Sequence, residues 1–561
     1  MKSGTKRAMS AFALIGCAAS LSAASGCFAL GEGLEPPLQE FYYPTAIVTS
    51  PGGHVAYVVN SDFDIQYTGG TVQALDLDSL RLCTDRLARR LGEGASATNA
   101  CAELGLGLNE DPVVVPGPCA PIDVSSPLAC SLSDDSSTVE VEGTVAGPLI
   151  RSSRIVGAFA SAAALMRNPN PGAGEPAARL FVAVRGDPSV TYFDITDDER
   201  EPDADPFRLD CGAVVVDNDP VGGRCGKLNQ IGRSPYQSSR PLRLPVEPVG
   251  IAASDGGASQ TVFPLVGVHQ TTASASLLMN KWSVDPTLEH VLSGLPDGPS
   301  DVAAIPTPAF VRRRVADGDT SVDYQPSFVA SYRASRSVDI LRYYDDSEST
   351  VARHFLQRVA GYFVLTNSDG SDSRGVALDP SERKACEAGC NDVESCLRAC
   401  LDIPIGVYIA NRLPASLLIG KLSTTILEEE GEVRGIVDSI TIDDMEPLTT
   451  GPSRVITGAV LDANGRSSPR IMVVSFDSRS VFIYNPLERR IETVVHTGRG
   501  PQALAVDVVE DADGALGHAY LYVAHFTDSY IGVVDLDTRR PITYGSIIAS
   551  VGKPTPPKES N

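Results

Sequence analysis

The chain alternates between short apolar runs and polar turns in a pattern that repeats seven times. Each unit opens with a run such as PTAIVTS (44–50) or PQALAVD (501–507), usually after a Pro or a Gly-Pro pair. A second run follows, of the type AYVVN (56–60) or YVAHF (522–526). Runs of this length that are rich in Val, Ile, Tyr and Phe are typical of β-strands.

Two more apolar runs complete most units. The third resembles TVQALDLDS (71–79), and the fourth is less regular, as in STVEVEG (137–143) or PLRLPVE (241–247). In the second unit we take SSRIVGAFA (152–160) as the opening strand. Four strands cannot bury their own apolar faces, so each unit needs neighbours. The pattern predicts an all-β, seven-bladed β-propeller with four antiparallel strands per blade.

Insertions lengthen the blades. The spacing is about 72 residues per unit, against roughly 40–45 in a minimal propeller. We place insertions at about 81–137, 197–239 and 381–402, and they carry ten cysteines: Cys83, Cys101, Cys119, Cys130, Cys211, Cys225, Cys386, Cys390, Cys396 and Cys400. The first two insertions follow the third strands of blades 1 and 2, and the last follows the first strand of blade 5. Since the first and third strands of a blade run in the same direction, all three insertions should leave the same face of the ring. We expect a disulfide-pinned cap over one mouth of the channel.

The segment CEAGCNDVESCLRAC (386–400) predicts a short helical hairpin. Its cysteines are paired at a spacing of four, which places each pair on one helix face. Two facing helices favour the nested pairing Cys386–Cys400 and Cys390–Cys396. The alternative is a four-thiolate zinc site, although an oxidising compartment favours disulfides.

The remaining cysteines suggest further disulfides. Cys211 and Cys225 are the lone pair of their loop. In the first insertion we predict that neighbours pair, Cys83 with Cys101 and Cys119 with Cys130.

The amino terminus has the pattern of a secretory signal. Basic residues precede an apolar stretch that ends in Ala24-Ser25-Gly26-Cys27. A small-residue stretch ending in Gly-Cys resembles the bacterial lipobox, whose Cys is acylated. Cys17 competes for this role, but cleavage at Cys27 leaves an even number of cysteines that can all pair. An ordinary signal without lipid is the other alternative.

These patterns divide the chain into residues 1–26 as signal, 27–40 as tether, 41–552 as propeller and 553–561 as tail. A lipidated Cys27 would anchor the body to a membrane. Phe28 beside it resembles lipoproteins sorted to the outer membrane, so we expect an envelope lipoprotein that faces the periplasm or the surface.

The formal net charge is −24. This balance argues against nucleic acid as a partner, because phosphate binding needs clustered Lys and Arg. Solubility on a crowded surface is an equally simple explanation of the charge.

No protease, hydrolase, phosphate-loop or haem motif occurs, so no catalytic residue, cofactor or metal is assigned. Polar residues after the second strands nevertheless form a candidate ligand face, which can equally consist of solvated turns. Its members are Asp62, Arg185, Asp187, His269, Arg333, Arg412, Asp477, His525 and Asp528.

The last unit, AYLYVAHFTDSYIGVVDLDT (519–538), resembles the YVTN or lactonase-like seven-bladed propeller superfamily. The resemblance implies the fold, and the superfamily includes both sugar-lactone hydrolases and binding proteins. Its hydrolases hold a divalent metal with Glu, Asn and Asp in the channel. Asn60 and Asn411 keep the Asn of the strand motif, but a carboxylate-rich set cannot be assembled here.

Two hypotheses follow. We favour a membrane-anchored, non-enzymatic propeller that binds a protein, glycan or other envelope component, with the oligomeric state undetermined. The alternative is a metal-dependent lactone or ester hydrolase with its site in the channel.

Overall fold

The computed structural model describes residues 33–109, 115–126, 147–213, 221–235, 241–255, 263–318, 324–346, 353–363, 372–429, 432–512 and 516–554. The predicted signal, Cys27, Cys130 and the predicted strand 137–143 lie outside these residues. Among the residues described, no helix has the length and apolar character needed to cross a membrane.

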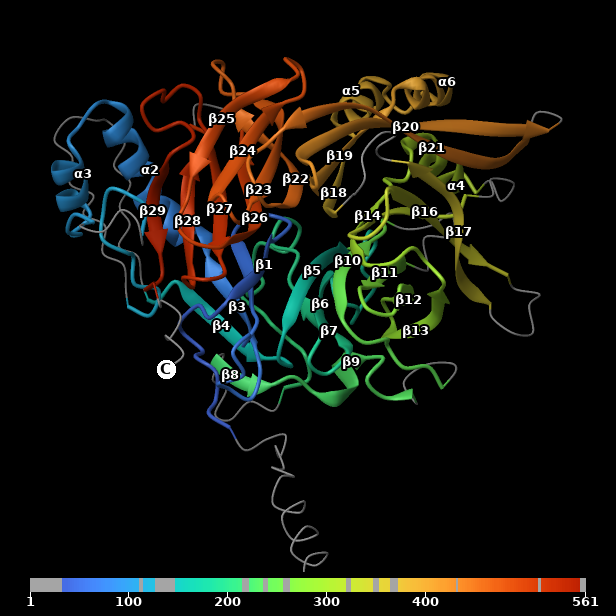
Figure 1. Cartoon of the computed structure of the whole chain (residues 1–561), viewed down its shortest axis with the longest axis horizontal. Helices are drawn as coiled ribbons and strands as arrows, with labels where there is room; N and C mark the ends of the chain where they lie inside the picture. The colour runs from blue at the N-terminus through green and yellow to red at the C-terminus, as the bar shows by residue number, and fades with distance from the viewer. Residues whose placement is uncertain are drawn as a thin grey trace, which may run out of the picture.

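The strands form seven sheets, which are arranged as the blades of a propeller (Figure 1). The blades are numbered here in chain order. The first strand of each blade faces the centre of the ring. These inner strands are β1 (Pro44–Thr49), β5 (Ala160–Arg167), β10 (Pro248–Ala253), β14 (Pro299–Ala304), β18 (Ser373–Asp379), β22 (Pro452–Leu461) and β26 (Pro501–Val509). The predicted fold is confirmed, with four antiparallel strands in every blade.

The other strands follow outward in each blade. Blades 1 to 3 contain β2 (Val55–Asn60), β3 (Thr71–Asp76) and β4 (Ile150–Ile155); β6 (Ala178–Val184), β7 (Ser189–Ile195) and β9 (Gln230–Ile231); β11 (Phe263–His269), β12 (Ser274–Lys281) and β13 (Val284–Ser293). Blades 4 and 5 contain β15 (Ser327–Tyr332), β16 (Ser337–Asp345) and β17 (His354–Phe363); β19 (Ile405–Arg412), β20 (Ala415–Glu429) and β21 (Glu432–Pro447). Blades 6 and 7 contain β23 (Ser467–Ser475), β24 (Ser480–Asn485) and β25 (Arg490–His496); β27 (His518–His525), β28 (Tyr530–Asp535) and β29 (Ile547–Val551).

The cores lie between blades. Tyr520 and Tyr522 of β27 pack with Ala56 and Val58 of β2, across the junction of blades 7 and 1. The second strands are buried on both faces, which explains their continuous apolar runs. The ring closes by packing of β1 against β26. Ile122 of the first insertion also forms a parallel bridge with Val551 of β29, in blade 7.

The predicted strands are wrong in two places beside the long insertions. The run 152–160 is not one opening strand, because Ile150–Ile155 forms the outer strand β4 of blade 1 and β5 begins at Ala160. The fourth strand of blade 2 is the short β9, not residues 241–247. Apolar periodicity shows that a strand exists, whereas its sheet depends on long-range pairing.

The first insertion leaves the ring after β3 and begins with helices α2 (Leu77–Gly92) and α3 (Ala97–Glu103). Leu80 and Leu87 of α2 pack with Tyr520 and Ile548 of blade 7. Figure 1 shows both helices outside β29, at the perimeter of the ring. The described insertion therefore covers outer strands and does not form the expected cap over the channel.

The disulfide pairing predicted for this insertion is wrong. Cys101 pairs with Cys119, which also excludes the predicted Cys83–Cys101 and Cys119–Cys130 bonds. The fold of the insertion brings Cys101 within 5.4 Å of Cys119, measured between Cα atoms, and the sequence order of the cysteines does not reveal this contact. Cys83 is itself disulfide-bonded.

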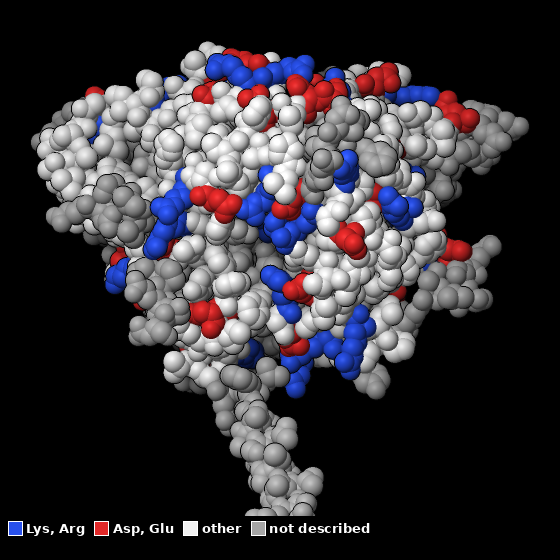
Figure 2. Space-filling model, viewed as in Figure 1, with Lys and Arg blue, Asp and Glu red and all other residues white. Residues whose placement is uncertain are grey.

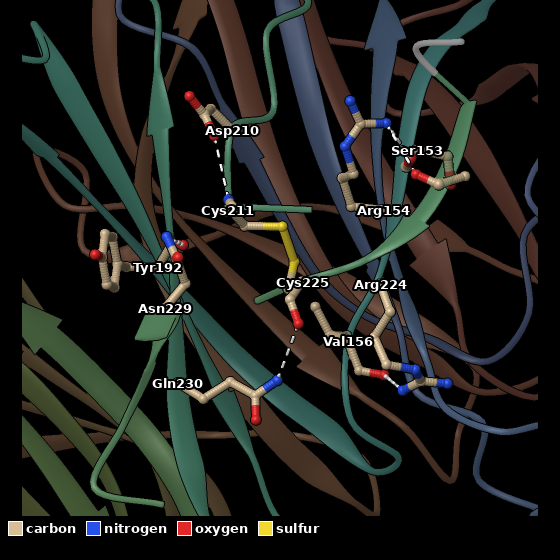
Figure 3. Close-up of a disulfide and its surroundings, with 12 residues drawn as sticks. Ser153, Arg154, Val156, Tyr192, Asp210, Cys211, Arg224, Cys225, Asn229 and Gln230 are labelled. Carbon is tan, nitrogen blue, oxygen red and sulfur yellow. Dashed lines mark hydrogen bonds between the residues drawn. A yellow bond between two sulfur atoms is a disulfide. The ribbon is translucent and has the colours of Figure 1, made fainter. Parts of the chain in front are cut away.

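The second insertion joins blades 1 and 2. Its strand β8 (Val221–Arg224) pairs in parallel with β4 and adds a fifth strand to blade 1. A short 3-10 helix, η1 (Lys227–Asn229), then leads into β9. The predicted Cys211–Cys225 disulfide is confirmed and lies in the core between these blades (Figure 3).

The third insertion is the predicted helical hairpin, α5 (Ser381–Gly389) and α6 (Glu394–Ala399), followed by η3 (Cys400–Asp402). The nested disulfides Cys386–Cys400 and Cys390–Cys396 are confirmed. Three of these sulfurs lie close enough to hold a metal ion, but in the disulfide form they are not thiolate ligands. The hairpin packs against helix α4 (Ala309–Ala316) of blade 4.

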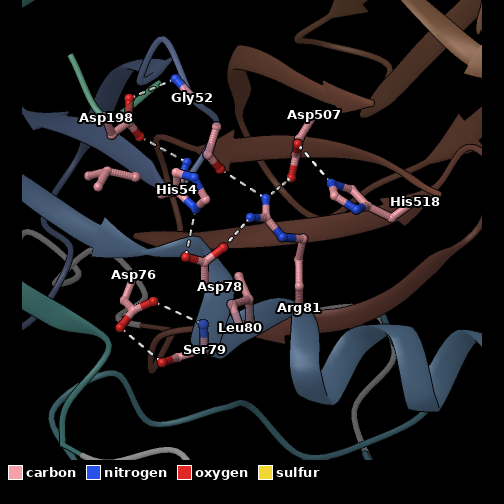
Figure 4. A network of polar contacts seen from close by, with 12 residues as sticks. Gly52, His54, Asp76, Asp78, Ser79, Leu80, Arg81, Asp198, Asp507 and His518 are labelled. Atoms are coloured by element: carbon pink, nitrogen blue, oxygen red, sulfur yellow. Dashed lines mark hydrogen bonds and ion pairs between the residues drawn. The ribbon is translucent and has the colours of Figure 1, made fainter. Parts of the chain in front are cut away.

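A polar network fastens the junction of blades 1 and 7 (Figure 4). Arg81 of α2 donates to the carbonyl oxygen of Gly53 in blade 1 at 2.9 Å and to Asp507 in blade 7 at 2.6 Å. Asp507 also contacts Nε2 of His518 at 3.0 Å. The insertion thus contributes directly to closing the ring.

Candidate functional site

Every inner strand begins with a β-bulge. The pairing with the second strand shifts after the first residue, which leaves the next residue unpaired. The unpaired residues are Thr45, Ser161, Val249, Ser300, Arg374, Ser453 and Gln502. All seven line one cavity of 350 Å³ at the channel. Bulges redirect side chains in this way in many binding sites.

A second tier comes from the ends of the second strands. In each blade, the last paired residue of the second strand lies opposite the first residue of the inner strand, and the residue after it lines the same cavity. In blade order these residues are Ser61, Arg185, Gln270, Arg333, Arg412, Phe476 and Phe526. This cavity, here called the channel mouth, opens where the inner strands begin and the second strands end. In Figure 2, basic side chains gather near the centre of the ring, with acidic side chains scattered among them.

The channel mouth has two chemically different halves. Blades 2 to 5 supply the cationic and amide side chains Arg185, Gln270, Arg333, Arg374 and Arg412, to which blades 6 and 7 add Arg454 and Gln502. Blades 6, 7, 1 and 2 supply the aromatic side chains Phe476, Phe526, Phe63 and Phe159. Among the described residues that line the cavity, none is an Asp or a Glu.

Three arginines meet at the junction of blades 4 and 5. Arg374 donates to Asp372 at 2.5 and 2.8 Å, and Arg333 lies 3.6 Å from the same carboxylate. Arg412 forms an ion pair with Asp477. Burial and the neighbouring Arg374 guanidinium lower the pKa of Arg333. Among the described residues, two carboxylates thus pair with three guanidinium groups here, which leaves an excess of positive charge.

Arg454 of blade 6 reaches across the channel. Its guanidinium donates to the carbonyl oxygen of Ser161 in blade 2 at 3.4 Å and lies 3.9 Å from Asp301 in blade 4. Burial raises the pKa of Asp301 despite this contact. Arg454 therefore adds a cation to the channel, where a buried carboxylate neutralises it only partly.

Hydroxyl groups of the bulge tier connect neighbouring blades. Thr45 donates to the carbonyl oxygen of Ala160 at 2.9 Å, and Ser161 donates to that of Pro248 at 2.7 Å. Ser300 makes the equivalent bond to Ser373 at 2.6 Å. Because these hydroxyls donate their hydrogens to backbone carbonyls of the next blade, they can offer only acceptor lone pairs to the channel.

The aromatic half is a packed cluster. The ring of Phe63 lies 5.1 Å from that of Phe526 and 5.9 Å from that of Phe159, in edge-to-face geometry. Tyr43 supports Phe526 at 5.0 Å. Phe63 remains 50 % exposed. A half-exposed aromatic ring beside a basic cavity is available to a ligand.

The structure separates the candidate residues inferred from the sequence. Arg185, Arg333 and Arg412 lie in the channel mouth, and Asp477 pairs with Arg412 behind it. Asp187 pairs with Arg233 at 2.8 Å, and Asp528 is buried against Arg499 at 2.7 Å. These last two carboxylates do not line the cavity.

His269 and His525 are fully buried and lie outside the cavity lining. Nε2 of His269 contacts the hydroxyl of Ser276 at 2.7 Å, and His525 stacks on Tyr530 at 4.1 Å. Burial lowers the pKa of His269 to about 4 and that of His525 to about 3. Both side chains are neutral and structural, while the next residues, Gln270 and Phe526, face the channel.

Asp62 is also buried, at 1 % exposure. Its Oδ1 accepts a hydrogen bond from the Tyr67 amide at 3.1 Å, whereas Oδ2 has no partner among the described residues. Burial raises its pKa to about 7. Asp62 therefore holds the loop that carries Phe63.

Sequence reasoning missed Arg374, Arg454 and the phenylalanines. The available signal was the Pro that opens five of the seven inner strands, directly before the bulged residue. Blades 2 and 5 open with Ala160 and Ser373 instead, so this signal does not mark Arg374. It was not decisive because a bulge depends on the pairing of two strands.

No family model matches the chain, and no curated protein does. Solved structures with similar folds include hydrazine synthase of Kuenenia stuttgartiensis, at 12% identity and TM-score 0.38, which covers 90% of this chain and 98% of that one. The periplasmic gluconolactonase PpgL of Pseudomonas aeruginosa matches at 10% identity and TM-score 0.38, over 82% and 86% of the two chains. A Desulfotomaculum acetoxidans protein of unknown function matches at 10% identity and TM-score 0.38, over 72% and 88%. These similarities do not indicate what this chain binds.

Proposed function

We propose that this chain is a non-enzymatic binding module of a bacterial cell envelope, and that it binds an anion at the channel mouth. One observation carries the proposal: five arginines line the cavity, and no acidic residue does among the described lining residues. Arginine binds carboxylate and phosphate groups in bidentate geometry, and partial burial strengthens such contacts. The site is basic although the chain as a whole is strongly acidic.

The same observation speaks against the hydrolase alternative. A divalent metal in the channel requires several oxygen ligands from carboxylates or amides. The described residues place guanidinium groups at this position, with Asp301 held beneath Arg454. We therefore favour binding over metal-dependent hydrolysis.

The proposal keeps the envelope setting. Acylation of Cys27 would tether the propeller to the outer membrane, and the YVTN or lactonase-like superfamily remains the proposed relationship. The last part of the predicted tether lies against blade 1, where Gln73 donates to the carbonyl oxygens of Leu38 and Glu40, both at 3.0 Å. An anionic group on a protein, glycan or envelope metabolite is the partner this site supports.

The experiment measures thermal unfolding of the full-length chain, purified in detergent, with and without citrate. We expect citrate to raise the unfolding midpoint, because a ligand stabilises the folded state it binds. The double variant Arg333→Gln/Arg412→Gln should lose this rise. Arg489→Gln, which removes an exposed arginine that pairs with Asp444 elsewhere on the ring, should keep it. An equal rise in the double variant, or none in the native chain, contradicts the proposal.

A separate experiment tests the anchor. Cells that express the chain are labelled with a palmitate analogue, and the Cys27→Ser and Cys17→Ser variants are compared. Label that depends on Cys27 alone supports the anchor, and label that depends on Cys17, or no label, contradicts it.

A further inference from the structure

We infer that the ligand of the channel mouth is a planar aromatic acid that carries at least two anionic groups. This inference rests on the proposed anion-binding function and specifies its ligand class. It follows from the division of the mouth into a basic half and an aromatic half, and from the backbone positions at which the aromatic half is built.

The residue before the inner strand has a positive φ in six blades. Blades 4, 6 and 7 use glycine there, namely Gly298, Gly451 and Gly500 with φ of 71°, 89° and 67°. A Cβ atom on Gly451 or Gly500 would approach the side chain of the following turn within 2.6 and 2.2 Å. The repeat therefore favours glycine at this position, both for its backbone freedom and for the close approach.

Blades 1, 2 and 3 depart from this rule. Tyr43, Phe159 and Glu247 occupy the same position with φ of 49°, 56° and 53°. The left-handed conformation is unfavourable for residues with bulky side chains, and such exceptions concentrate at functional sites. A large side chain at a position suited to glycine needs a reason outside the local backbone.

All three exceptional side chains serve the channel mouth. Phe159 lines the cavity, and Tyr43 packs on Phe526, which also lines it. Glu247 accepts a hydrogen bond from the lining residue Arg185 at 3.1 Å. Residues other than glycine therefore occupy this positive-φ position in the blades where their side chains line or support the channel mouth.

The aromatic half offers a surface for a flat ring. The ring of Phe63 is nearly perpendicular to those of Phe526 and Phe159 and is tilted by 52° to that of Tyr43, so none of these three rings stacks parallel on it. It is 50 % exposed. A planar aromatic ligand can stack on or meet such rings edge-to-face.

The opposite half offers more than one anion subsite. Arg333 and Arg374 share Asp372, while Arg412 pairs with Asp477 on the next blade. Their guanidinium groups outnumber the described carboxylates at this junction. Arg454, which the buried Asp301 neutralises only partly, raises the excess to between one and two positive charges. Two acidic groups on one ligand would balance this excess, with bidentate contacts available to each.

Two dicarboxylic acids that differ in ring type provide the test. Isophthalate and cis-cyclohexane-1,3-dicarboxylate carry the same charges on an aromatic and a saturated ring. Both are titrated by calorimetry into the full-length chain, purified in detergent. We expect isophthalate to bind about tenfold more tightly, which is the scale of an aromatic pair contact.

Two kinds of variant assign the difference to the two halves. Phe63→Leu should bring the two affinities together, because it keeps an apolar side chain but removes the aromatic ring. Arg374→Gln should weaken both acids, whereas Arg489→Gln should change neither.

The outcomes distinguish the inference from the proposed function. Equal, arginine-dependent binding of both acids overturns the aromatic ligand class and leaves the anion site standing. Binding of neither acid overturns both. A preference for isophthalate that survives in Phe63→Leu also overturns the assignment to the aromatic half.

Discussion

Nη1 of Arg81 lies 2.6 Å from a carboxylate oxygen of Asp507, although the two residues are 426 positions apart in the chain. Arg81 belongs to the first insertion and Asp507 to the last inner strand. The pair therefore holds the first and last blades together, beside the packing of β1 against β26.

Breaking this pair should loosen the ring. Arg81→Met removes the cation from a contact in which both residues are at least 91 % buried, and leaves the Asp507 carboxylate with His518 and the hydroxyl of Tyr522 as partners. We expect a loss of about 3 kcal/mol in the free energy of unfolding, measured by urea denaturation. The control is Arg89→Met on the exposed side of the same helix, which should change stability little. Equal losses in the two variants would show that the helix as a whole, not the ion pair, is responsible.

Phe159→Gly should separate stability from binding. Glycine relieves a left-handed backbone that costs about 1 kcal/mol or more for a residue with a Cβ atom. The variant also loses a half-buried ring. We expect a small net change in stability together with weaker binding of isophthalate, measured by denaturation and calorimetry. A large loss of stability with unchanged affinity would make Phe159 a structural residue.

His525 should make the native chain sensitive to acid. Its folded-state pKa of about 3 lies below the ordinary value, so the unfolded chain binds the extra proton first. Stability is then complete above pH 6.5 and falls as the pH drops toward 3. Between pH 7 and pH 5 this residue should account for a loss of about 2 kcal/mol.

The variant His525→Asn tests this, since Asn60 and Asn411 occupy the equivalent place in blades 1 and 5. Denaturation at pH 7 and pH 5 should show a smaller loss in the variant than in the native chain. An unchanged difference between the two pH values would mean that His525 does not titrate during unfolding.

Asp62 should act in the opposite direction. Burial raises its pKa to about 7, so the folded chain holds a proton that the unfolded chain releases near pH 4. Below pH 4 the carboxyl is protonated in both states, so its titration does not reduce stability. As the pH rises from 4 to 7, ionisation of the unfolded chain progressively lowers the free energy of unfolding. Asp62→Asn keeps the acceptor for the Tyr67 amide and removes the charge.

We expect Asp62→Asn to be more stable than the native chain at pH 8, by about 1 kcal/mol or more, and to differ little at pH 4. Thermal unfolding at both pH values measures this. Asp64→Asn, in the same loop but exposed, is the control. A variant that is less stable at pH 8 would show that the ionised carboxylate has a partner.

The Cys211–Cys225 disulfide should stabilise the junction of blades 1 and 2. It joins residues 14 positions apart and closes the segment that supplies β8 to the sheet of blade 1, just before the chain enters β9 of blade 2. The double variant Cys211→Ser/Cys225→Ser should lose about 3 kcal/mol, the scale for a loop of this length, measured by denaturation. The double variant Cys390→Ser/Cys396→Ser removes a disulfide that closes a shorter loop, on a peripheral hairpin, and should lose less of the free energy of unfolding. A larger loss of stability in the hairpin variant would show that the hairpin disulfide contributes more than Cys211–Cys225.

The sequence alone determined the number of blades, the count of four strands in each and the nested cysteines of the hairpin. These features are local, since periodicity two along a strand and spacing four along a helix follow from backbone geometry. Cysteines on two facing helices therefore paired as their spacing indicates.

Only the tertiary structure decided which residues face the channel. A shift of one residue along a strand moves a side chain to the other face, so His525 is buried while Phe526 lines the cavity. The bulges that expose Arg374 and Ser161 arise from pairing between strands, and the Cys101–Cys119 bond from packing of an irregular insertion. Such contacts join residues distant in the chain, and no local pattern in a single sequence encodes them.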